Sequence, residues 1–234
     1  MKHIKLFENF EDGDINIFSE DIESICKELG IENWTLNGDG TVDVDGHVNL
    51  YNKGLFEQLP LKFGEVTGSF RCDSNHIASL EGCPSIVGGD FNCSDNRLET
   101  LEGISIEVGG NFNCSHNKLD SLKSGPISVG GCFNCSYNEL TKLEGAHIKV
   151  NRRFTCYKNY LINLEGIPDV GGDFDCEGNQ IFEVYKLFPN HKSFMESLDY
   201  DYLRGTNIIK WKFKEALDEF DIKLPESLRQ YKYI

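Results

Sequence analysis

The stretch VGGDFNCSDNRLETLEG (residues 87–103) decides the fold, because its pattern recurs through the middle of the chain. It returns almost unchanged as VGGNFNCSHNKLDSL (residues 108–122). Six cysteines keep the same step, at separations of 21, 21, 21, 21 and 20 residues: Cys72, Cys93, Cys114, Cys135, Cys156 and Cys176. A constant period of this length is typical of proteins built from stacked repeats.

Other residue types keep step with the cysteines. A phenylalanine stands two residues before each one, at positions 70, 91, 112, 133, 154 and 174, and an asparagine three residues after it, at positions 75, 96, 117, 138, 159 and 179. Phe and Cys therefore lie on the same face of an extended strand. One repeat, or coil, cannot bury that face alone. We expect the coils to stack with parallel strands about 4.8 Å apart, Phe over Phe and Cys over Cys.

Three further features refine this prediction. An earlier, degenerate coil has Val48 in the Phe place and Leu50 in the Cys place, so about seven coils are expected. The asparagine amide can satisfy backbone groups in its own coil and the next. The Gly-Gly pairs, such as Gly88 and Gly89, are predicted to supply turn conformations before each strand. A coil of 20–22 residues leaves little room for a helix on its other side.

The flanks of the repeats look different. Residues 19–29 predict a short helix with Ile22, Cys26 and Leu29 on one face, and residues 34–48 predict short strands. Residues 192–203 and 207–220 look helical. The predicted organisation is an N-terminal α/β cap (1–43), a parallel β solenoid (44–185) and a C-terminal helical cap (186–234).

Composition excludes several classes of function. The net charge is −15, with 38 acidic against 23 basic residues, which disfavours binding to nucleic acid. No apolar run approaches the 18 residues that a membrane span needs. Six of the nine cysteines stand in the inward column, which predicts reduced core thiols rather than disulfides or a metal site. We expect no cofactor, and a monomer or weak oligomer.

Candidate binding residues are those that flank Phe and Cys, because they should face outward on a concave sheet. Their middle is a neutral strip of Asn and Ser, whereas the last two coils mix aromatic and charged residues, the usual anchors of protein interfaces. The predicted partner-binding residues are Arg71, Asp73, Asn92, Ser94, Asn113, Ser115, Asn134, Ser136, Arg153, Tyr157, Lys158, Tyr160, Asp175 and Glu177. No nucleophile or carboxylate is tied to His76 or His116 by spacing, so the chain is not expected to be an enzyme.

The template F-x-C-x-x-N-x-[LI]-x-x-L resembles the leucine-rich repeat, with Phe and Cys in the first two leucine places. The repeats, together with DGTVDVDGHVNLYNKGL (residues 39–55) and LPLKFGEVTGSFRC (residues 59–72), are similar to leucine-rich-repeat proteins of T4-like tailed phages. Asn151 and Arg152 depart from the pattern where it has Gly-Gly. The resemblance implies a protein-binding scaffold without enzymatic activity in the cytoplasm of a host bacterium, directed at a host or phage protein such as a defence protein.

The first ten residues, MKHIKLFENF, leave two alternatives open. They are compatible with an ordinary frayed terminus. They also resemble the capsid-targeting segment of T4-like internal head proteins, with Leu6-Phe7-Glu8 as the cleavage signal. That resemblance implies a virion component, trimmed after Glu8 and delivered with the genome.

Overall fold

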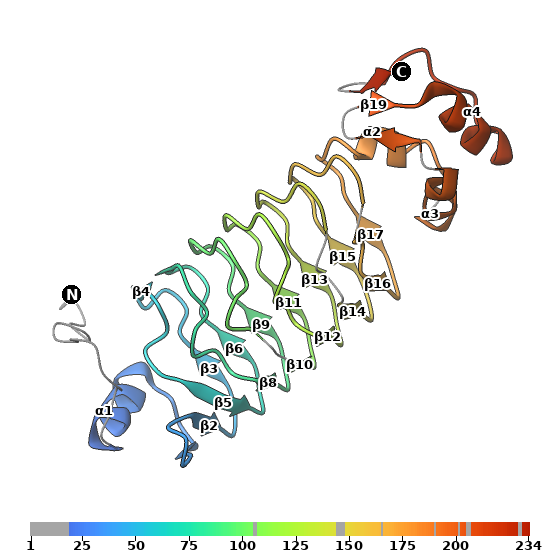
Figure 1. Cartoon of the computed structure of the whole chain (residues 1–234). Coiled ribbons are helices and arrows are strands. Elements are labelled where there is room, and N and C mark those ends of the chain that lie inside the picture. Colours follow the sequence, from blue (N-terminus) through green and yellow to red (C-terminus); the bar gives the residue numbers. More distant parts are fainter. Residues whose placement is uncertain are drawn as a thin grey trace.

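The structure, a computed structural model, describes residues 19–104, 107–143, 148–164, 166–189, 191–200, 202–204, 207–228 and 231–234. The possible targeting segment, residues 1–8, lies outside this part. Mostly parallel β-sheet runs through the middle of the chain, with few helices, and these lie toward its two ends. In Figure 1 the coils follow one another along a nearly straight line from the blue to the red end. This arrangement is compatible with the predicted repeat solenoid.

One sheet carries the Phe and Cys columns. It has seven strands, all parallel, and pairs each coil with the next in register, so that Phe91 lies between Phe70 and Phe112. The degenerate coil belongs to it, because Val48 pairs with Phe70. The predicted seven parallel strands are therefore confirmed: β3 (Val48–Asn49), β6 (Phe70–Arg71), β9 (Phe91–Asn92), β11 (Phe112–Asn113), β13 (Phe133–Asn134), β15 (Phe154–Thr155) and β17 (Phe174–Asp175).

The sequence analysis missed a second sheet of eight strands. Each coil enters it through the pair of residues that ends in the valine before Gly-Gly, and Val66, Val87 and Val108 are buried there. A strand this short contains no alternation to detect. Its members are β1 (Trp34–Leu36), β2 (Val42–Val44), β5 (Phe63–Val66), β8 (Ile86–Val87), β10 (Glu107–Val108), β12 (Ser128–Val129), β14 (Lys149–Val150) and β16 (Asp169–Val170), of which β1 alone runs antiparallel to its neighbour.

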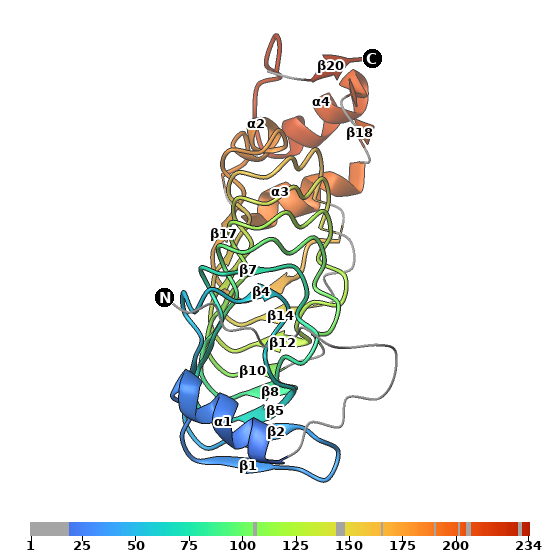
Figure 2. The same ribbon diagram turned by 90° about the vertical axis from the view of Figure 1, so that its left-hand side faces the viewer.

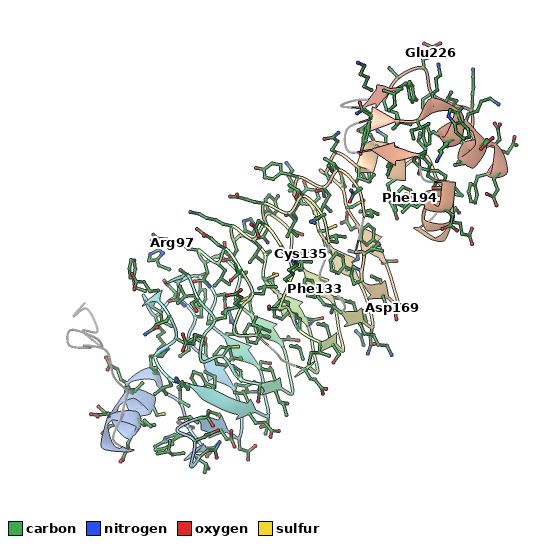
Figure 3. The ribbon with its side chains drawn as sticks, viewed as in Figure 1. Arg97, Phe133, Cys135, Asp169, Phe194 and Glu226 are labelled. Carbon is green, nitrogen blue, oxygen red and sulfur yellow. The ribbon has the colours of Figure 1, made fainter. Side chains whose placement is uncertain are left out.

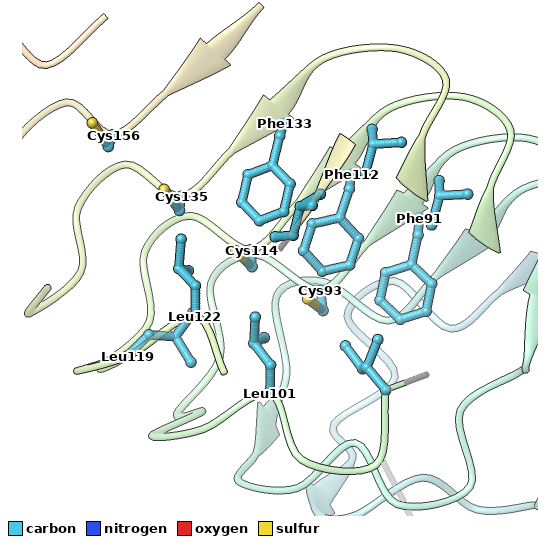
Figure 4. Packing of buried hydrophobic residues seen from close by; sticks show 14 of the residues in the cluster. Phe91, Cys93, Leu101, Phe112, Cys114, Leu119, Leu122, Phe133, Cys135 and Cys156 are labelled. Carbon is cyan, nitrogen blue, oxygen red and sulfur yellow. The ribbon is translucent and has the colours of Figure 1, made fainter. Parts of the chain in front are cut away.

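The core is a set of columns that run along the stack. Figure 4 shows Phe91, Phe112 and Phe133 above one another, beside the cysteine column. Ring centroids of neighbouring phenylalanines lie 5.0–5.8 Å apart. Each inner cysteine is fully buried, and Cys93 Sγ donates to the carbonyl of Asn113 in the next coil at 3.5 Å. All nine cysteines are free thiols.

A column of buried asparagines joins the coils by side-chain hydrogen bonds. Asn117 Nδ2 donates to the carbonyls of Cys93 and Cys114 at 3.1 Å each, and its Oδ1 accepts the Leu98 N–H at 3.0 Å. The predicted role of the amide is confirmed, but the second coil that it serves is the preceding one rather than the next. The chain leaves the strand at this point, and the amide replaces the sheet bonds that end there.

Replacing Asn117 by alanine should lower the free energy of unfolding by about 3 kcal/mol or more, because buried polar groups left without a partner cost about 1–3 kcal/mol each. Urea denaturation followed by circular dichroism measures the change. The control is Lys118→Ala at the exposed neighbouring position. Equal, small losses in both variants would contradict the structural role of the asparagine column.

The Gly-Gly pairs have a different cause from the one predicted. None of Gly88, Gly89, Gly109 and Gly110 has a positive φ. Instead the backbones of successive coils meet here, since a Cβ on Gly109 would lie 2.2 Å from the carbonyl oxygen of Gly88. The chain bends at these glycines before each strand, as predicted, but a left-handed backbone is not the reason for glycine there. These four positions are glycine because a Cβ at each would lie too close to atoms of the preceding coil.

Gly109→Ala should therefore force two coils apart and lower the free energy of unfolding by about 3 kcal/mol, the upper end for overpacking. Gly38→Ala is the matched control, because a Cβ there meets nothing within 4 Å and the φ of Gly38 is not positive. Thermal and urea unfolding of both variants checks the difference. A Gly109 variant as stable as the Gly38 variant would show that the close approach is relieved at no cost.

Both ends of the stack are covered. Helix α1 (Ser19–Leu29) has the predicted bounds, and its apolar face of Ile22, Cys26 and Leu29 is buried in the core.

Strands β4 (Phe56–Glu57) and β7 (His76–Ile77) form a small separate pair. The C-terminal elements are α2 (Phe182–Tyr185), α3 (His191–Ser197), the 3-10 helix η1 (Leu198–Tyr200), β18 (Leu203–Arg204), β19 (Asn207–Ile208), α4 (Lys210–Glu219) and β20 (Lys232–Tyr233), which Figure 2 shows at the upper end of the stack.

The C-terminal helices are shorter than predicted. Leu203 pairs with Ile208 in a strand hairpin, so the first helical segment stops before Leu203 and the second begins only at Lys210. The buried face of α4 consists of Phe213, Ala216 and Leu217. Among the residues that the structure describes, no helix is long and apolar enough to cross a membrane.

Candidate functional site

The exposed surface of the seven-stranded sheet, called the sheet face below, carries one side chain from each of six coils. They come directly before each cysteine: Arg71, Asn92, Asn113, Asn134, Thr155 and Asp175. Arg71 is exposed and the other five are half-buried. The stack in Figure 1 is nearly straight, so the predicted concave curvature is slight.

Each asparagine on the sheet face turns the chain away from the strand. The Oδ1 atoms of Asn92, Asn113 and Asn134 accept the backbone N–H two residues later, at 3.1, 3.1 and 3.0 Å. This is an Asx turn, in which the side chain imitates a backbone turn. A backbone N–H needs an oxygen as its acceptor. This bond therefore fixes each side-chain amide with Oδ1 toward the turn and Nδ2 on the opposite side.

Four predicted binding residues are not on an exposed surface. Asp73, Ser94, Ser115 and Ser136 are each only 5% exposed. Strict alternation would place them outward, but the strand ends at the cysteine. An Asx turn then bends Ser94, Ser115 and Ser136 inward, and the Arg71 guanidinium donates to Asp73. The prediction that these four side chains face a partner is therefore wrong.

A second polar ladder borders the sheet face, three residues before each cysteine. The side chain of each residue accepts the N–H of its equivalent in the next coil: His47 from Ser69, Ser69 from Asp90, Asp90 from Asn111, and Asn111 from Cys132. The residue after Cys132 in this column is Arg153, which instead pairs with Asp173 at 3.2 Å, and both side chains are exposed. Near the C-terminal end of the stack, the side chains of this column no longer accept backbone N–H groups and instead form an exposed ion pair.

On the other side of the sheet face lies the turn edge, defined as the residues one to four positions after each cysteine. Its second position has a left-handed backbone in every coil, with φ of 55° at His116, 55° at Tyr137 and 54° at Lys158. The last coil has Gly178 there, with φ of 77°. Side chains other than glycine pay roughly 1–2 kcal/mol in this conformation. The sequence therefore keeps large side chains at positions where glycine fits.

The turn edge brings aromatic residues together. The rings of His116 and Tyr137 stack with centroids 4.3 Å apart, and Tyr157 lies edge-on to Tyr137 at 5.4 Å. Lys158 Nζ lies 5.7 Å from the centre of the Tyr157 ring, and Tyr160 is 64% exposed. The predicted residues Tyr157, Lys158 and Tyr160 thus lie together. Tyr137, 43% exposed, was missed, although its place two residues after Cys135 marks it.

The described residues form no group of three or more His, Cys, Asp or Glu side chains that could hold a metal ion. Cys83 and Cys176 are unsuited to nucleophilic catalysis, because burial raises the pKa of each to about 12 and keeps both thiols protonated. A depression of about 270 Å³ beside β2 and β5 contains Asp43, Asp45 and Glu65. Asp43 and Asp45 already accept hydrogen bonds there, from the Glu65 N–H and the Thr67 hydroxyl.

Comparison with known proteins identified no relative of this chain. No family model, no curated protein and no solved structure matches the chain. The proposals below therefore rest on the chain's own residues.

Lys158→Gly should leave the free energy of unfolding unchanged or raise it by about 0.5 kcal/mol, because relief of the left-handed strain offsets the greater chain entropy of glycine. The matched control is Lys118→Gly on the same edge, where φ is not positive. That variant should lose about 0.5–1 kcal/mol. Urea denaturation compares the two, and a larger loss at Lys158 than at Lys118 would refute the strain argument.

Proposed function

We propose that the chain is a leucine-rich-repeat solenoid of T4-like phage origin and serves as a protein-binding scaffold without enzymatic activity. Support for the repeat class comes from the parallel, in-register strands and the buried asparagine in each coil. Support for phage origin comes from the resemblance of residues 39–55 and 59–72. The scaffold acts in the host cytoplasm on a host or phage protein, a defence protein being one such target.

The observation that carries the proposal is a cluster in the last two coils, called the C-terminal patch: Arg153, Tyr157, Lys158, Tyr160, Asp175 and Glu177. Tyr157 and Asp175 are half-buried and the others are exposed. Tyrosine and arginine provide most of the binding energy at protein interfaces, since each presents apolar area and hydrogen-bonding groups together. The carboxylates beside them supply directionality through charge.

The left-handed backbone of Lys158 recurs at the same position in every coil, so it does not distinguish the patch. The stacked pair His116 and Tyr137 continues the aromatic surface of the patch along the turn edge.

The test is an affinity capture from bacterial lysate, compared between wild type and Arg153→Ala/Tyr157→Ala/Tyr160→Ala. A stoichiometric protein partner should be retained by wild type and lost with the patch variant. The control is Glu65→Ala/Glu107→Ala/Lys149→Ala, which changes three exposed residues on the eight-stranded sheet. A purified partner then gives dissociation constants, and the patch variant should bind about 100-fold or more weakly.

Equal binding of the partner by the patch variant and the control variant would refute the C-terminal patch as the interface. The alternative role, a packaged virion component, is favoured by Leu6-Phe7-Glu8 in the sequence. It predicts that protein recovered from particles begins at Asn9. N-terminal sequencing separates the two roles, because a cytoplasmic scaffold is neither packaged nor cleaved there.

A further inference from the structure

In the three asparagines of the sheet face, only the oxygen of each side-chain amide takes part in a hydrogen bond within the fold. Their Oδ1 atoms cap the turn, whereas the Nδ2 atoms of Asn92, Asn113 and Asn134 have no acceptor among the residues that the structure describes. Each NH2 group offers two donors. The three side chains are half-buried, so their donors lie at the surface yet are partly shielded from water. We call these groups the amide row.

The amide row has a fixed repeat. Asn113 pairs in register with Asn92 on one side and Asn134 on the other, so the donors recur at the spacing of neighbouring strands, about 4.8 Å. A ligand that satisfies all three needs acceptors at a similar interval along a line. Carbonyls on one side of an extended polypeptide recur only about every 6.6 Å, and fall out of step by the third position.

The charge of the surface narrows the ligand further. Asn92, Asn113, Asn134 and Thr155 form four consecutive uncharged positions on the sheet face. No cation stands within this row to attract a phosphate or carboxylate polymer, and the chain as a whole carries −15. An uncharged polymer rich in oxygen acceptors fits this surface better than an anionic one.

We infer that the amide row binds a linear, uncharged β-1,4-linked glycan lying along the stack. In such an extended chain one sugar ring spans nearly the distance between neighbouring strands, so each coil meets one ring. Ring oxygens and hydroxyls accept the amide donors. The exposed ring of Tyr137 on the bordering turn edge offers an apolar face of the kind that packs against sugar C–H groups. This site is separate from the proposed protein partner, whose residues are those of the C-terminal patch.

The first variant is Asn92→Asp/Asn113→Asp/Asn134→Asp. An aspartate keeps the oxygen that caps the turn, as Asp175 does for the Glu177 N–H at 3.0 Å, and removes the donors. Because sugar hydroxyls can donate to the new carboxylates, the result of this variant is compared with that of a neutral one. A second variant, Asn92→Thr/Asn113→Thr/Asn134→Thr, places the residue of the Thr155 position in all three coils and stays neutral. Circular dichroism establishes that both variants are folded.

The experiment titrates cellohexaose, xylohexaose and mannohexaose separately into the full-length protein, with calorimetry for affinity and 1H–15N spectra for the asparagine NH2 signals. At least one glycan should bind in the millimolar range or tighter and shift those three signal pairs. The Thr variant should bind about tenfold or more weakly, because several hydrogen bonds are lost and no carboxylate replaces them. Maltohexaose, whose α-1,4 linkage curves the chain, should not bind.

Three results would overturn the inference: no shift with any of the three extended glycans at tens of millimolar, unchanged affinity in the Thr variant, or equal binding of maltohexaose. Failure here leaves the proposed protein scaffold standing. Arg153→Ala/Tyr157→Ala/Tyr160→Ala, which tests that scaffold, leaves the amide row intact and should retain the NH2 shifts.

Discussion

In-register pairing of each coil with the next is the constraint on which the rest of the structure depends. Once Phe112 must lie between Phe91 and Phe133, every other column follows at the same spacing of about 4.8 Å. Apolar residues then stack into a continuous core, and a buried amide recurs at each point where the strand ends. Figure 3 shows the result: Phe133 and Cys135 lie inside the stack, whereas Arg97 and Asp169 lie at its margins.

Close stacking explains why the sequence is so repetitive at some positions and free at others. Gly109 faces the backbone of Gly88 and Asn117 bonds to three carbonyls, so a substitution at either position disturbs the neighbouring coil. The second position of the turn edge varies from serine to tyrosine, although its backbone is left-handed throughout. Variation under strain, beside strict repetition, separates the surface that can carry function from the scaffold that holds it.

The sequence was sufficient to predict the stacked columns of the core. It was insufficient to predict the structure where the chain turns between strands. Period, Phe, Cys and Asn predicted seven parallel strands and their core, because each column is set by a repeated side chain. The second sheet was missed, since its two-residue strands show a single inward valine such as Val108. Ser94 and its equivalents were misplaced for the same reason: alternation fails where a strand ends after two residues. The close approach at Gly109 depends on the neighbouring backbone, which no single repeat reveals.

The two proposed surfaces follow from one property of stacked coils, which is that any exposed residue type becomes a row. Where the row is uniform, as at Asn92, Asn113 and Asn134, it presents a periodic array suited to a periodic ligand. Where the row changes, as from Thr155 to Asp175 and from Cys132 to Arg153, it presents a unique patch suited to a unique partner. A protein partner needs the break in the pattern, because identical rungs would allow it to bind in several registers with equal affinity.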